Sequence, residues 1–177
     1  MPVFERAMFF PRPVAEVFDF FCRPVNLVTI SPPELHMQLL AGPERIELGS
    51  RVTLKGRRWG LPQMMVSEIR LFESNVKFIN AMVQGPFRKW DHLHSFAPLQ
   101  DGTHVSDQIE YEPPGGLLGL VATPSLIKRD MERLYVYRFD KVGGYSEAGW
   151  SPETEKKEPR GSLVKAAGFA VCSAVAR

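Results

Sequence analysis

Two neighbouring stretches of sequence decide the fold of this chain. GPFRKWDHLHSF (residues 85–96) is followed, after the short link APLQDG, by THVSDQIEY (residues 103–111). Asp101 and Gly102 in the link form a dipeptide that is typical of tight turns. Side chains alternate between the two faces of a strand, so Trp90, His92, His94 and Phe96 share one face of the first stretch, and Val105, Asp107, Ile109 and Tyr111 share one face of the second. We therefore predict a β-hairpin whose turn centres near residues 100 and 101.

This turn position also predicts which residues lie opposite one another, because successive pairs step outward from the turn. On one face of the hairpin the predicted pairs are Trp90 with Tyr111, His92 with Ile109 and His94 with Asp107. Two imidazoles, a carboxylate, a phenol and an indole among apolar groups are unusual for a core. They are typical of a cavity wall that carries a few polar anchors.

Length and composition exclude several classes of protein. The chain has 177 residues, 44% of them hydrophobic, and a formal net charge of +2, so we expect no nucleic-acid binding. Cys22 and Cys172 have neither disulfide-framework nor zinc spacing. No signal-peptide pattern and no run of about 18 apolar residues occurs, so we expect a cytoplasmic protein without a transmembrane segment.

The remaining elements follow from periodicity and from proline or glycine breaks. A first strand is predicted at 3–10, and two short helices are predicted at 14–21 and 24–30. Further strands are predicted at 35–40, 51–59, 63–72 and 76–84, ahead of the hairpin. A long helix covers 117–142, where Pro124 marks either a kink or a later start after Thr123.

Helices kept apart from a long antiparallel run of strands predict an α+β fold. We expect one domain at residues 1–144, followed at 145–177 by a linker and a tail rich in small residues at 163–176.

The local sequence resembles a known family. The motifs are G-P-F-x-x-W-x-H-x-H-x-F, then G-T-x-V-x-D-x-I-x-Y-x-x-P-x-G, and Y-R-F in the long helix. Over residues 2–142 they resemble the START/Bet v 1-like (SRPBCC) superfamily, in particular bacterial polyketide cyclase/dehydrase-like ligand-binding proteins. The resemblance implies a helix-grip fold, in which seven antiparallel strands curve around a long C-terminal helix, with an apolar pocket between them.

Candidate site residues lie on the hairpin face, the preceding strand and the long helix. The predicted ligand-binding residues are Phe78, Met82, Trp90, His92, His94, Phe96, Asp107, Ile109, Tyr111, Met131 and Tyr135. A carboxylate beside an imidazole can act as a strut between strands, as a ligand anchor or as a general-base pair, so His94 and Asp107 are the catalytic candidates. His92, His94 and Asp107 could also ligate a metal, but the flanking aromatic residues favour an apolar wall. We expect neither a metal nor another cofactor.

Three functions remain open. The first is binding of an apolar or aromatic small molecule, lipid- or polyketide-like, between the sheet and the last helix. The second is a polyketide cyclase- or dehydratase-like enzyme that uses the His–Asp pair. The third is an interaction or membrane-surface protein that acts through residues 163–176.

Overall fold

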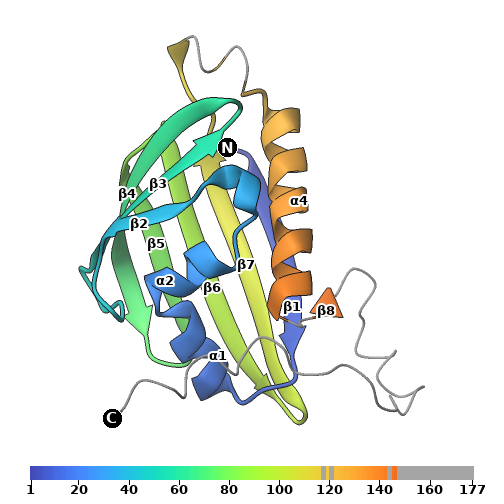
Figure 1. Ribbon diagram of the computed structural model, residues 1–177. Helices are drawn as coiled ribbons and strands as arrows, with labels where there is room; N and C mark the ends of the chain where they lie inside the picture. The colour runs from blue at the N-terminus through green and yellow to red at the C-terminus, as the bar shows by residue number, and fades with distance from the viewer. Residues whose placement is uncertain (117–118, 120–121, 143–144, 147–177) are drawn as a thin grey trace.

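A single curved antiparallel sheet forms most of the molecule. The computed structural model describes residues 1–116, 119, 122–142 and 145–146. The strands occur in the spatial order β2-β3-β4-β5-β6-β7-β1-β8, so the first strand joins the sheet beside β7 (Figure 1). Their bounds are β1 Val3–Phe10, β2 Gln38–Ala41, β3 Arg51–Arg58, β4 Leu61–Glu73, β5 Lys77–Gln84, β6 Lys89–Leu99, β7 Gly102–Glu112 and β8 Tyr145–Ser146.

The predicted hairpin is confirmed as β6 and β7. Leu99 pairs with Gly102, so the turn consists of residues 100 and 101. The three predicted pairs are also observed: Trp90 with Tyr111, His92 with Ile109, and His94 with Asp107. Gly102 is required for a reason other than turn geometry, because a Cβ atom there would collide with the backbone oxygen of Phe10 on β1.

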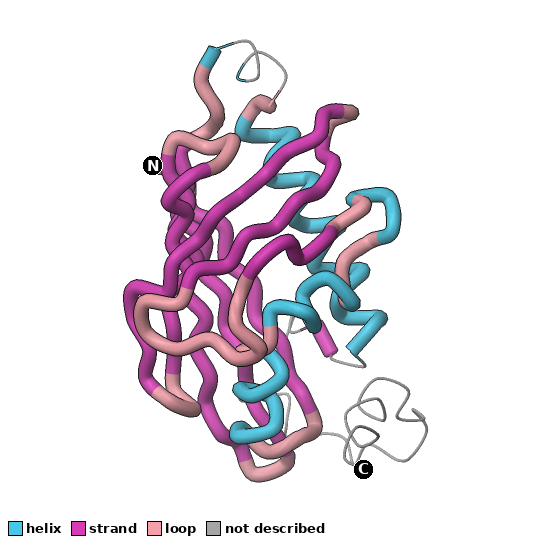
Figure 2. The backbone as a smooth tube through the Cα atoms, turned by 60° about the vertical axis from the view of Figure 1, so that its left-hand side comes forward, coloured by secondary structure: helices cyan, strands magenta, loops and turns pink. Residues whose placement is uncertain are grey.

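The helices lie on one side of the curved sheet (Figure 2). They are α1 Val14–Phe21, α2 Pro24–Thr29, the short 3₁₀ helix η1 Pro33–Leu35 and α4 Pro124–Val142. Pro24 begins α2, where the missing N–H costs no helical hydrogen bond. α4 begins directly after Thr123, which confirms the later of the two predicted starts.

Some predicted boundaries are wrong. Residues 33–35 form η1, and strand β2 begins only at Gln38. The turn after β3 is made by Trp59 and Gly60, both with positive φ, so residues 61 and 62 belong to β4. Beyond the predicted seven strands, residues 145 and 146 pair with β1 as the short β8, although the predicted linker begins there. Residues 163–176 lie outside the described part of the chain.

The core is built where α1 and α4 meet the sheet. Phe18 on α1 has no exposed surface, and its ring lies 5.0 Å from that of Phe96 on β6. On α4, residues spaced three or four apart lie on the face of the helix that packs against the sheet. The buried members of this helix are Ile127, Met131, Tyr135, Phe139 and Val142.

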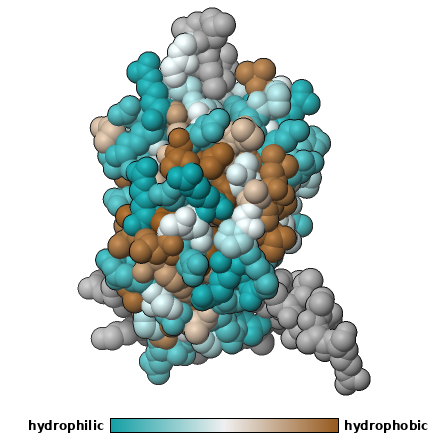
Figure 3. All heavy atoms as spheres, turned by 90° about the vertical axis from the view of Figure 1, so that its left-hand side faces the viewer, coloured by the Kyte–Doolittle hydropathy of each residue, from teal (hydrophilic) through white to brown (hydrophobic). Residues whose placement is uncertain are grey.

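The outer face of the sheet exposes apolar side chains only in scattered places. Figure 3 shows hydrophobic residues in several patches among hydrophilic ones. Exposed large apolar residues of β2, β4 and β5 include Leu40, Leu61, Met64 and Val83. Such scattered exposure is ordinary for a soluble surface. Among the described residues, no helix has the length and apolar character needed to cross a membrane.

Candidate functional site

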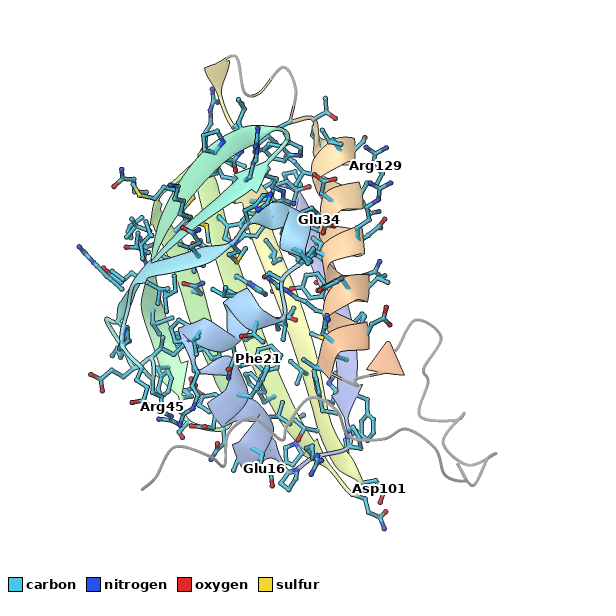
Figure 4. All side chains as sticks on the ribbon, viewed as in Figure 1. Glu16, Phe21, Glu34, Arg45, Asp101 and Arg129 are labelled. Atoms are coloured by element: carbon cyan, nitrogen blue, oxygen red, sulfur yellow. The ribbon has the colours of Figure 1, made fainter. Side chains whose placement is uncertain are left out.

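A cavity of about 1290 Å³ lies between the concave face of the sheet and the helices. Its walls come from β1 and from β3 to β7, from α1, α2 and η1, and from α4. It reaches the surface where exposed residues of η1, of the β3–β4 turn and of α4 join the lining, such as Glu34 and Gly60. Figure 4 labels Glu34 on η1 and Arg129 on α4, and both residues belong to the cavity lining.

Most of the predicted site residues line this cavity. They are Phe78, Trp90, His92, His94, Asp107, Ile109, Met131 and Tyr135. The remaining three are packed elsewhere. Phe96 is covered by Phe18 of α1, Tyr111 packs beside Phe87, and the Met82 side chain folds against Gly85. Whether the lining residues bind a ligand stays a prediction.

The polar residues of the hairpin meet around one carboxylate oxygen. Oδ1 of Asp107 lies 3.0 Å from Nε2 of His92 and 2.6 Å from Nδ1 of His94. The hydroxyl of Tyr135 on α4 lies 3.2 Å from the same His92 nitrogen. Nδ1 of His94 is buried and, despite its short approach to Asp107, is not aligned for a hydrogen bond. Asp107 therefore contacts both imidazoles, with a hydrogen bond to His92 and a closer charge contact with its cross-strand partner His94.

Burial and charge determine how these groups ionise. Burial opposes the charged form of Asp107, but the charge of His94 and the hydrogen bond from His92 outweigh it and lower the pKa of this carboxyl. Burial, together with the charge of His94, lowers the pKa of His92 to about 4. Since an ionised carboxylate only accepts hydrogen bonds, we assign the proton of neutral His92 to Nε2, which donates a hydrogen bond to Asp107. Burial, and then the charge of Asp107, raise the pKa of Tyr135.

A charged residue of α4 also belongs to the lining. Arg138 lies one turn beyond Tyr135, and its guanidinium carbon is 5.7 Å from the centre of the Tyr135 ring. Its Nε atom is buried and has no hydrogen-bond partner among the described residues. Burial lowers the pKa of Arg138, and the nearby Tyr135 and Asp107 partly offset this effect.

A polar contact joins the β3–β4 turn to α4 at the mouth of the cavity. The indole Nε1 of Trp59 donates a hydrogen bond of 2.5 Å to Asp130, and the Arg58 guanidinium lies 3.8 Å from the same carboxylate. The Trp59 ring packs 6.2 Å from that of Phe87. Asp130, which the helical pattern assigns to the solvated face of the helix, therefore links α4 to the β3–β4 turn at the mouth of the cavity.

The residues that could hold a metal are His92, His94 and Asp107, whose ligand atoms all lie within 4.8 Å of one another. Two imidazole nitrogens and a carboxylate oxygen form a set that zinc accepts. An ion would, however, have to replace the hydrogen bond between His92 and Asp107. The expectation that no metal binds stays a prediction.

Sequence reasoning missed Arg138 and the Trp59–Asp130 contact. The sequence could have predicted the position of Arg138. It follows Met131 by seven residues and Tyr135 by three, and this helical spacing places its charge beside the buried side of α4. The Trp59–Asp130 contact joins residues 71 positions apart, so no local pattern could predict it.

Known structures share this fold. A START superfamily protein from Mycobacterium smegmatis is 17% identical with a TM-score of 0.60, and the match covers 80% of this chain and 97% of that one. The protein TTHA0849 from Thermus thermophilus is 19% identical with a TM-score of 0.62, over 78% and 95% of the two chains. Ginseng major latex-like protein 151 from Panax ginseng is 15% identical with a TM-score of 0.56, over 77% and 93%. At these identities the likeness establishes the helix-grip fold.

A family model provides the closer assignment. No curated protein matches this chain. The model described as "Polyketide cyclase / dehydrase and lipid transport" matches residues 10–140, which is more than half of the chain and includes strands β2 to β7 and nearly all of α4. The chain therefore belongs to the polyketide cyclase/dehydrase and lipid transport family.

Proposed function

We propose that this protein binds a lipid- or polyketide-like small molecule in the cavity between the sheet and α4. The observation that carries the proposal is the cavity itself. Its volume of about 1290 Å³ exceeds the range of roughly 300–1,000 Å³ that is usual for small-molecule sites. Its lining is largely apolar, with a buried polar cluster around Asp107 and further charged side chains, such as Arg58 and Asp130, at the mouth. Such a wall favours an apolar body with one polar end.

The proposal is tested by placing a larger side chain on α2 that fills part of the cavity. Leu27 lines the cavity, whereas Val25 on the same helix is 54% exposed. The Leu27→Trp variant should bind a fluorescent apolar probe such as pyrene-1-butanol at least tenfold more weakly. Val25→Trp, which adds the same ring outside the cavity, should bind it like the wild type.

Native mass spectrometry of the purified protein, exposed to lipid extracts, provides an independent measurement. We expect a retained small molecule in the wild type and its loss in Leu27→Trp. If the wild type retains nothing and a crystal structure shows side chains filling the cavity, the proposal is wrong.

Acid–base catalysis is a second candidate, and the His92–Asp107 pair favours it. Both side chains line the cavity, and a neutral imidazole held by a carboxylate is the arrangement of a general base. A poly-β-keto thioester incubated with the wild type should then lose water, as followed by mass spectrometry. His92→Gln should abolish this reaction, and equal yields with and without protein would exclude it for this substrate.

A further inference from the structure

A charged side chain inside the cavity has no acceptor within the part of the chain that the structure describes. The described residues form no hydrogen bond and no ion pair with the Arg138 side chain, although its Nε atom is buried. A guanidinium presents five N–H donors in a planar fork. Its remaining nitrogens are not among the fully buried unpaired atoms, and Arg138 is a half-buried residue of the cavity lining, so these donors remain accessible to a bound molecule.

Neighbouring carboxylates do not satisfy this cation. Three acidic side chains of the lining have other partners: Asp107 contacts His92, Asp130 contacts Trp59, and Glu132 contacts Arg6. Burying a charge without a partner is costly, so buried cations in proteins are normally paired. An unpaired arginine that faces a cavity points to a partner outside the described chain.

We propose that Arg138 binds the carboxylate of the ligand, so that the ligand is an amphipathic acid with an apolar body. This inference rests on the proposed function and adds the chemical class of the ligand. A carboxylate matches the planar fork of arginine with two parallel hydrogen bonds. The ionised Asp107, whose charge acts on Arg138, would repel a doubly charged phosphate more than a singly charged carboxylate.

Two fluorescent probes separate the charge from the apolar body. Pyrene-1-butanoic acid and pyrene-1-butanol share ring and chain and differ at the terminal group. We expect the wild type to bind the acid about tenfold or more tightly than the alcohol, as charge-assisted hydrogen bonds allow. Arg138→Met should lose this preference and bind the alcohol as before.

Two further variants distinguish the fork from the charge alone. Arg138→Lys keeps the charge without the planar fork, so it should keep only part of the preference. Arg70→Met removes an exposed arginine from β4 outside the cavity and should keep the whole preference.

Thermal unfolding without ligand tests for a structural role. Because Arg138 has no hydrogen-bond partner among the described residues, the Tm of Arg138→Met should equal or exceed that of the wild type. A lower Tm in both Arg138 variants, with the acid preference retained in Arg138→Met, would mean that Arg138 supports the fold without binding the carboxylate and would overturn the inference.

The binding data also separate the two proposals. Equal affinity of the wild type for acid and alcohol overturns the carboxylate inference but leaves ligand binding in place. Binding of neither probe overturns the proposed function and the inference with it.

Discussion

The stability of this protein should fall by about 2 kcal/mol between pH 7 and pH 5 through His92 alone. Burial, and then the charge of His94, lower the pKa of His92 from 6.5 to about 4 in the folded state. Between these two values the unfolded chain binds a proton that the folded chain does not. Acidification therefore favours the unfolded state, and the free energy of unfolding decreases as the pH falls.

The magnitude follows from the two pKa values. Each pKa unit corresponds to about 1.4 kcal/mol, so the full loss through His92 is about 3 kcal/mol, of which about 2 kcal/mol is reached at pH 5. Asp107 acts in another window, because its pKa is lowered in the folded state. Its contribution is present above the ordinary value of 3.8 and is lost only at lower pH.

Urea unfolding at pH 7, 6 and 5 measures this effect. His92→Gln keeps a side-chain N–H that can reach Asp107 but cannot take up a proton, so its stability should fall about 2 kcal/mol less than that of the wild type over this range. His36→Asn removes an imidazole outside the buried cluster and should fall as the wild type does. Equal pH slopes for wild type and His92→Gln would refute the reasoning.

Three further changes test the packing and the mouth of the cavity. Phe18→Ala should lower the free energy of unfolding by about 3–5 kcal/mol in urea titrations, because the ring is fully buried; an effect below about 1 kcal/mol would contradict this packing. Gly102→Ala should be destabilising by more than about 1 kcal/mol in the same assay, since its Cβ would collide with the Phe10 carbonyl; unchanged stability would contradict the close approach. Trp59→Phe removes the hydrogen bond to Asp130, so stopped-flow measurements should show faster entry and release of pyrene-1-butanol; unchanged rates would show that this contact does not restrict the mouth.

Local patterns were sufficient for most of the architecture. The hairpin register followed from its turn, because side chains alternate at a period of two and one buried face allows no slip. Pro124 predicted either a kink or a later start after Thr123, and the structure has the later start, since proline is tolerated at the first position of a helix. The predicted strand at 35–40 was wrong at its beginning, since proline and tertiary contacts favoured a 3₁₀ turn over an apolar strand.

Among the candidate site residues, the sequence separated the inner face from the outer face but could not separate cavity wall from core. Ile109 and Phe96 both face inward, yet Ile109 lines the cavity and Phe96 is covered by α1. A wall and a core have the same composition, so only the positions of the helices distinguish them.

Short-range periodicity encodes the strand order along the chain, the hairpin register and the set of inward-facing residues. The packing of distant elements decided that Asp107 hydrogen-bonds to His92 as well as contacting its cross-strand partner His94. It also decided that Arg138 enters the cavity without an acceptor among the described residues. Both facts depend on how α4 lies across a curved sheet, and that arrangement arises from contacts between residues far apart in the chain.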